Sequence, residues 1–251
     1  MLRQAIYAGS LIYITPAPSW VRQDKCMTKP SDHLQRLMDG YEIFRAVEYE
    51  RQRERYTRLA AEGQRPPTMV IACSDSRVDP ATVFHAAPGE MFVLRHIAAL
   101  VPPCEKDGRH HSAAAAIEYA ITQLEVEHVV VFGHGGCGGI AASLSGCFDH
   151  SEEGEGGFVH HWVETIRPER DRLVKSMPHA SEEQRQLALE LGSIKLSLGR
   201  LREFPGVAER EASGMLHLYG AHFDIRSGTL RMLAEGDGEF QTIMDEAVCA
   251  I

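Results

Sequence analysis

The chain has 251 residues, of which 44% are hydrophobic and 24% charged, and its formal net charge is −9. This length and composition suit one substantial α/β core and do not require a second domain. An acidic surface repels nucleic acid and anionic membranes, and no apolar run approaches the ~20 residues that span a bilayer, so we expect neither partner.

The cysteines do not form the dense pattern of a small disulfide-bonded domain. They stand at positions 26, 73, 104, 137, 147 and 249. Reduced thiols or metal ligands suit a chain of this size better, and we therefore expect a cytoplasmic protein.

The first 26 residues differ from the rest of the chain. Their short apolar run is broken by prolines, and they hold too few basic residues for a clear secretory signal. We interpret residues 1–26 as the product of a start codon assigned too far upstream, or else as a disordered arm, and rank export last. Apolar side chains at helical spacing predict an amphipathic helix over residues 33–48, with Ser31 as a possible cap. The predicted domain is therefore 27–251.

Strand and helix patterns alternate after this helix. Short apolar runs rich in β-branched residues predict strands over 68–73, 91–94 and 128–133. Asp79 followed by Pro80 is typical of a helix start, and the alanine-rich segment 112–125 predicts a longer helix. Strands that alternate with helices pair in parallel. The expected fold is a single α/β domain with a mainly parallel central sheet flanked by helices.

The C-terminal half continues the pattern with one change. Residues 158–204 read as a long helical region broken at two prolines. Residues 214–233 then predict two strands around a turn at Ser227 and Gly228, which would form an antiparallel hairpin at the edge of the sheet.

A polar cluster follows the first predicted strand. The segment IACSDSRVDP brings Cys73, Asp75 and Arg77 within five residues of one another. A thiol, a carboxylate and a guanidinium at one strand end are compatible with a metal site, a reactive thiol or a buried ion pair.

A second cluster favours the metal. The segment VVVFGHGGCGG ends another strand with His134 and Cys137 in a glycine-rich turn. Ligands of parallel sheets bind at the carboxyl ends of the strands, where Cys73 joins these two residues if the strands are neighbours. Taken alone, Cys73 is more often a small buried core residue, and His134 is more often a hydrogen-bonded core histidine. Together, two thiolates and an imidazole suit zinc and leave a fourth position for water.

These motifs resemble those of the β-class carbonic anhydrases. The family pattern is C-x-D-x-R followed about sixty residues later by H-x-x-C, and it stands intact at 73–77 and 134–137. The similarity runs on through PGEMFVLRHIAALVPP, AAIEYAI and GHGGCGGI, covers roughly 30–235, and leaves the first 26 residues unmatched. The resemblance implies reversible hydration of carbon dioxide to bicarbonate and a proton by attack of a zinc-bound hydroxide.

The resemblance also implies a role for each motif residue. Cys73, His134 and Cys137 would hold one zinc ion per chain. Asp75 would accept a hydrogen bond from the hydroxide and orient it, while Arg77 would keep Asp75 ionised and turned away from the metal. A purely structural ion pair between Asp75 and Arg77 is the alternative.

Substrate-binding residues rest on the resemblance alone. Gln64 would donate a hydrogen bond to a carbon dioxide or bicarbonate oxygen, Phe92, Ile97 and Tyr119 match apolar pocket walls, and the Gly138 backbone adjoins the zinc. Gln64 and Tyr119 favour the plant-like, constitutively open branch over the bicarbonate-regulated one. In the family a neighbouring subunit supplies part of each pocket, which implies a homo-oligomer built from dimers, either a homodimer or a homotetramer.

Two other functions stay open at this point. The same site would also hydrolyse a sulfur analogue such as carbonyl sulfide or carbon disulfide. A zinc-stabilised binding protein without turnover is the other, although intact Asp75 and Arg77 speak against it, because purely structural zinc sites close the fourth position with protein. His96 stands where the family usually has asparagine, and we expect it, like His110 and His111, at the surface.

Overall fold

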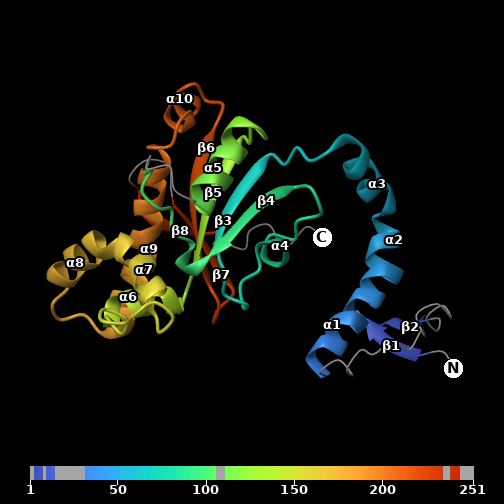
Figure 1. Cartoon of the computed structure of the whole chain (residues 1–251), viewed down its shortest axis with the longest axis horizontal. Coiled ribbons are helices and arrows are strands. Elements are labelled where there is room, and N and C mark those ends of the chain that lie inside the picture. The colour runs from blue at the N-terminus through green and yellow to red at the C-terminus, as the bar shows by residue number, and fades with distance from the viewer. Residues whose placement is uncertain (1–2, 8–9, 15–31, 106–110, 234–237, 244–251) are drawn as a thin grey trace. The chain divides into compact units, whose positions relative to one another are not determined.

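A computed structural model describes residues 3–7, 10–14, 32–105, 111–233 and 238–243 (Figure 1). These residues belong to two compact units, one that ends at Gly63 and one that begins at Gln64.

The N-terminal unit begins with a two-stranded antiparallel sheet. It consists of β1 (Arg3–Tyr7) and β2 (Ser10–Ile14), which pair with each other along their whole length. Both strands lie within the segment that the sequence analysis set apart as residues 1–26.

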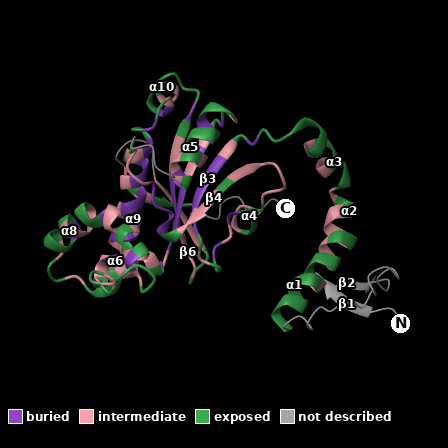
Figure 2. Ribbon diagram, in the orientation of Figure 1, coloured by how far each residue is buried: buried purple, intermediate pink, exposed green. Residues whose placement is uncertain are grey.

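A helical stretch completes this unit. Its parts are α1 (Asp32–Ile43), a π-helical turn (Phe44–Glu48), α2 (Tyr49–Arg51) and α3 (Arg53–Glu62). The helix predicted over 33–48 is confirmed and is followed by further helix, while its proposed cap, Ser31, lies outside the described residues. No residue of α1, α2 or α3 is buried (Figure 2).

The second unit is built on a six-stranded mixed sheet with the order β4-β3-β5-β6-β7-β8. Across the sheet these strands are β4 (Met91–His96), β3 (Thr68–Cys73), β5 (His128–His134), β6 (His217–Asp224), β7 (Thr229–Leu233) and β8 (Phe240–Thr242). The first four are parallel, and β7 and β8 join antiparallel at one edge. The predicted α/β fold with an antiparallel C-terminal hairpin is confirmed.

Helices pack mainly on one face of this sheet, and a short helix lies on the other (Figure 1). They are α4 (Pro80–Val83), α5 (Ser112–Thr122), α6 (Gly138–Ser145), α7 (Gly157–Val163), α8 (Arg167–Ser176), α9 (Glu182–Leu201) and α10 (Val207–Ala212). The predicted start of α4 is confirmed, since the Asp79 side chain accepts a hydrogen bond from the Thr82 N–H at 3.0 Å. The sequence analysis did not predict α6, α10 or β8.

The core lies on both faces of the parallel strands because their side chains alternate between the two. On one face, Ile71 packs in a cluster with Ile117 of α5 and Ile194 of α9. On the other face, Ala72 belongs to a cluster that includes Phe84, just after α4. Buried residues therefore gather in the central strands and in α9 (Figure 2). No helix within the described ranges is long and apolar enough to cross a membrane.

Candidate metal centre

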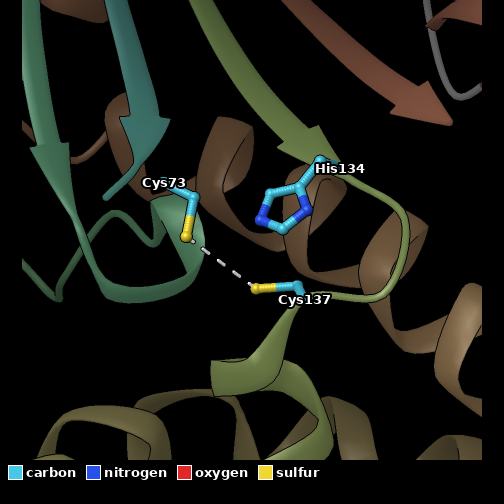
Figure 3. Close-up of side chains that lie close together, drawn as sticks. All are labelled: Cys73, His134 and Cys137. Atoms are coloured by element: carbon cyan, nitrogen blue, oxygen red, sulfur yellow. Dashed lines mark hydrogen bonds between the residues drawn. The ribbon is translucent and has the colours of Figure 1, made fainter. Parts of the chain in front are cut away.

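Three potential metal ligands converge at the carboxyl ends of two neighbouring strands (Figure 3). Cys73 ends β3, His134 ends β5, and Cys137 stands just before α6. Their ligand atoms all lie within 4.8 Å of one another, and all three side chains are buried. The pairing of β3 with β5, on which the predicted site depended, is thus present.

The spacing and the donor atoms fit a zinc ion. Tetrahedral coordination with Zn–S bonds of ~2.3 Å places two sulfurs about 3.8 Å apart, and the Sγ atoms of Cys73 and Cys137 are 4.0 Å apart. His134 Nδ1 faces the carbonyl oxygen of Gly135 at 3.0 Å, whereas His134 Nε2 is buried and has no hydrogen-bond partner among the described residues. A carbonyl only accepts, so Nδ1 carries the proton and Nε2 offers its lone pair to a metal.

The electrostatics of the two thiols also call for a cation. The hydrogen bond from Cys137 lowers the pKa of Cys73 to about 4, although burial opposes the shift. The same contact, together with burial, raises the pKa of Cys137. Two thiolates this close repel each other, so both ionise only with a positive charge between them. Burial lowers the pKa of His134, but its contacts with Cys73, Gly135 and Asp75 raise it by more. The pKa of His134 therefore lies above its usual value.

A carboxylate–guanidinium pair stands beside the ligands. Arg77 donates from Nε to Asp75 Oδ1 at 2.9 Å and from Nη2 to Asp75 Oδ2 at 2.7 Å. Arg77 is thereby the main cause that holds the pKa of Asp75 well below its usual range. Asp75 Oδ2 lies 3.8 Å from His134 Nε2, so the carboxylate borders the space between the ligand atoms.

Arg95 supports this loop, and the sequence analysis missed it. The guanidinium pairs with Asp79 at 2.9 Å and donates to three backbone carbonyls of the loop that follows β3. Those carbonyls belong to Cys73 at 3.0 Å, Asp75 at 2.8 Å and Val78 at 3.1 Å. A lone arginine in an apolar strand was the available signal, because a partly buried charge must find partners nearby.

Two glycines shape the ligand turn. Gly136 has a φ of +65°, a conformation that glycine adopts without strain. A Cβ at Gly139 would lie 2.6 Å from Ile97 Cγ2, so the absence of a side chain lets the start of α6 approach Ile97. Ile97 and Gly138, two of the predicted substrate-binding residues, therefore adjoin the metal centre.

The other three predicted substrate-binding residues lie away from the metal centre of their own chain. Phe92 pairs with Met69 in the sheet, four positions before Cys73, which separates Phe92 from the ligand end by about 13 Å along the strand. The ring of Tyr119 lies 5.9 Å from that of Phe92, and the exposed Gln64 precedes β3. A single chain does not bring these residues to the metal centre.

His96, which was expected at the surface, is partly buried. Its Nε2 is buried, its ring contacts Trp162 edge-on at 5.0 Å, and burial lowers its pKa. The cause is the register, which places His96 beside Cys73 at the end of β4 rather than on a loop. His111 is partly buried, and His110 lies outside the described residues.

Sequence comparison relates the chain to known enzymes. The carbonic anhydrase family model matches residues 68–230, which include all three potential ligands. The chain is also similar to β carbonic anhydrase 3 of Arabidopsis thaliana, at 35% identity over 198 residues that cover 79% of this chain and 76% of the plant protein.

Solved structures share the fold. The β-carbonic anhydrase CcaA gives a TM-score of 0.78 at 26% identity and covers 86% of this chain and 94% of its own. CafA of Aspergillus fumigatus gives 0.71 at 29%, with 82% and 94% covered. A tetrameric β-carbonic anhydrase of Sordaria macrospora gives 0.70 at 27%, with 81% and 98% covered.

Proposed function

This chain belongs to the β-class carbonic anhydrase family, and we propose that it catalyses the zinc-dependent, reversible hydration of carbon dioxide to bicarbonate and a proton. The observation that carries the proposal is the convergence of Cys73, His134 and Cys137 at the carboxyl ends of β3 and β5. The paired Asp75 and Arg77 beside them supply the polar groups that turnover needs.

The three converging residues would hold one zinc ion per chain. When bound, the ion supplies Lewis acidity, which makes a nucleophile of water at neutral pH. Three protein ligands leave a fourth position open, as in other catalytic zinc sites. The two thiolates of Cys73 and Cys137 neutralise more of the metal's charge than neutral imidazoles would, so the site depends more on how the chain orients the reacting water.

Asp75 would provide that orientation. Its Oδ2, which lies near His134 Nε2, accepts a hydrogen bond from the attacking water and fixes the direction of the attack. Arg77 keeps the carboxylate ionised and turned toward the guanidinium, so that it does not take the fourth position itself. This arrangement, with the presence of Gln64 and Tyr119, supports assignment to the plant-like, constitutively open branch.

A second copy of the chain would complete the substrate pocket. Ile97 and Gly138 lie next to the ligands of their own chain, whereas Gln64, Phe92 and Tyr119 stand at the opposite end of the sheet. Gln64, Phe92 and Tyr119 can line a substrate pocket only if they face the metal centre of a neighbouring subunit. This supports a homo-oligomer built from dimers, and the related Sordaria macrospora enzymes are tetrameric.

The sequence also supports the extent, the location and the partner class of the enzyme. The catalytic domain would comprise residues 27–251, with residues 1–26 as an extension. Cysteine usage supports a cytoplasmic location, and the net charge of −9 supports a small-molecule substrate rather than nucleic acid or a membrane as the partner.

The test is a pair of assays on the purified chain of known zinc content. Stopped-flow measurement would follow carbon dioxide hydration, and sulfide release would be measured in parallel with carbonyl sulfide and carbon disulfide. We expect fast hydration with little sulfide release. Sulfide release that exceeds hydration would assign the sulfur analogues as substrates, and bound zinc with neither activity would leave a non-catalytic zinc protein.

A further inference from the structure

A buried acid–imidazole pair lies behind the metal centre. Glu190 of α9 and His222 of β6 are 3% and 1% exposed, and Glu190 Oε2 lies 3.0 Å from His222 Nε2. Buried carboxylates are costly unless they are paired and hydrogen-bonded, and replacing such pairs by apolar residues is often neutral or stabilising. The position of this pair therefore calls for an explanation beyond stability.

The carboxylate of Glu190 forms a hydrogen bond with the backbone of Cys137, one of the three potential metal ligands. Its Oε1 accepts a hydrogen bond from the backbone N–H of Cys137 at 3.1 Å and another from Gln186 Nε2 at 3.0 Å. With His222 on Oε2, the carboxylate has three polar partners and one fixed orientation. Among them, the Cys137 N–H is the group that connects α9 to the ligand turn.

His222 contacts the same turn from the sheet side. A Cβ built on Gly135 would lie 3.8 Å from His222 Cε1, and the Gly135 N–H donates to the carbonyl of Phe223 at 2.9 Å. The backbone from Gly135 to Cys137 is therefore held between β6 and the Glu190 carboxylate. This short turn sets the distance between the ligands His134 and Cys137.

We propose that Glu190 and His222 are positioning residues of the metal centre. They act through the Cys137 backbone and hold the Cys137 thiolate at the distance from the Cys73 thiolate that a shared metal ion requires. The inference rests on the proposed function, because it assumes that these thiols bind zinc. Groups that orient metal ligands typically contribute about 10- to 100-fold in metal affinity or activity.

The test measures zinc affinity and release, not only turnover. Glu190→Ala removes the acceptor of the Cys137 N–H, whereas Glu190→Gln keeps an amide oxygen there. We expect Glu190→Ala to weaken zinc binding by about 10- to 100-fold in chelator competition, and Glu190→Gln to restore most of it. In cobalt-substituted protein, the thiolate-to-metal absorption band should shift in Glu190→Ala and return in Glu190→Gln.

Ser197→Ala is the matched control. Ser197 also lies on α9, is 1% exposed, and accepts one backbone N–H, that of Val101, at 3.1 Å. Among the residues that the structure describes, Ser197 has no hydrogen bond to the ligand turn, so its loss should lower stability without changing zinc release or the cobalt spectrum. Equal effects of Ser197→Ala and Glu190→Ala on zinc release would show that the pair is merely structural.

His222→Ala tests the positioning role of the pair if Glu190→Ala does not fold. It keeps the carboxylate and removes its Oε2 partner, so zinc release should accelerate severalfold, and His222→Gln, which retains a side-chain N–H, should slow it again. Unchanged zinc affinity in His222→Ala or in folded Glu190→Ala overturns the inference. Tight zinc binding without hydration by the unaltered chain would instead refute the proposed function and leave these zinc measurements interpretable.

Discussion

Arg77 holds Asp75 through two parallel hydrogen bonds, from Nε to Oδ1 at 2.9 Å and from Nη2 to Oδ2 at 2.7 Å. The same Nη2 group donates to the carbonyl oxygen of Gly136 at 3.2 Å, in the turn between two metal ligands. Paired bonds of this kind fix both the position and the direction of a carboxylate. The bond to Gly136 connects the loop after β3 to the loop after β5, so Arg77 has the geometry both of a clamp on the Asp75 carboxylate and of a brace between the two loops.

Arg77→Ala separates these two roles. If Arg77 keeps Asp75 off the metal, the freed carboxylate should move onto the zinc, so that zinc is retained while kcat falls by roughly 100-fold. Zinc content and stopped-flow hydration on the same sample would measure both quantities. The matched control is Arg167→Ala, since Arg167 is similarly exposed, at 57% against 54%, and pairs with Glu164 at 3.0 Å. Its kcat should not change.

Adding Asp75→Ala to Arg77→Ala should reopen the site to water without restoring the full rate, because the orienting hydrogen bond is also lost. The two substitutions should therefore be strongly non-additive in kcat. A lower melting temperature with near-normal turnover in the folded fraction of Arg77→Ala would show that the pair is only a brace.

Removal of a ligand should strongly weaken metal binding. Cys73→Ser and His134→Ala each leave an incomplete donor set, and we expect either variant to lose most of its zinc and nearly all activity. Metal analysis after gel filtration would measure the loss. Cys104→Ser and Cys147→Ser are controls of the same chemistry, since both cysteines are free and lie outside the cluster. Full zinc and full turnover in either ligand variant would refute the assignment.

A pocket shared between subunits predicts complementation. His134→Ala lacks the metal centre but keeps Gln64, whereas Gln64→Ala keeps the metal centre. Refolded together, half of the randomly formed dimers would be mixed, and each mixed dimer would hold one complete site. We expect about a quarter of wild-type activity, well above the mean of the two variants alone. No gain after mixing would indicate that one chain supplies its whole pocket.

The metal centre was predictable because its residues follow strand ends. Short apolar runs before Cys73 and before His134 marked two parallel strands, and their carboxyl ends meet at one edge of a sheet. Phe92 and Tyr119 show the limit of the same reasoning. The resemblance identified them, but only the pairing of Phe92 with Met69 placed them at the far end of the sheet from the ligands.

Glu190 was not predictable for a different reason. It stands four residues before Ile194 and eight before Leu198, so helical spacing puts it on the buried face of α9, but spacing does not show what the carboxylate contacts there. Its partner, His222, comes 32 residues later on a strand. Long-range polar contacts of this kind leave no local pattern in the sequence. The same holds for His96, whose partial burial follows from the strand register and not from its neighbours in the sequence.

The N-terminal extension supplies the last prediction. In the described part of the extension, β1 and β2 pair with each other in a sheet separate from the six-stranded one. A chain that begins at Met27 keeps α1, which starts at Asp32, and all residues of the metal centre. We therefore expect the same melting temperature, zinc content and hydration rate as the full chain. Insoluble or inactive protein from the shortened chain would show that the first 26 residues contribute to the catalytic fold.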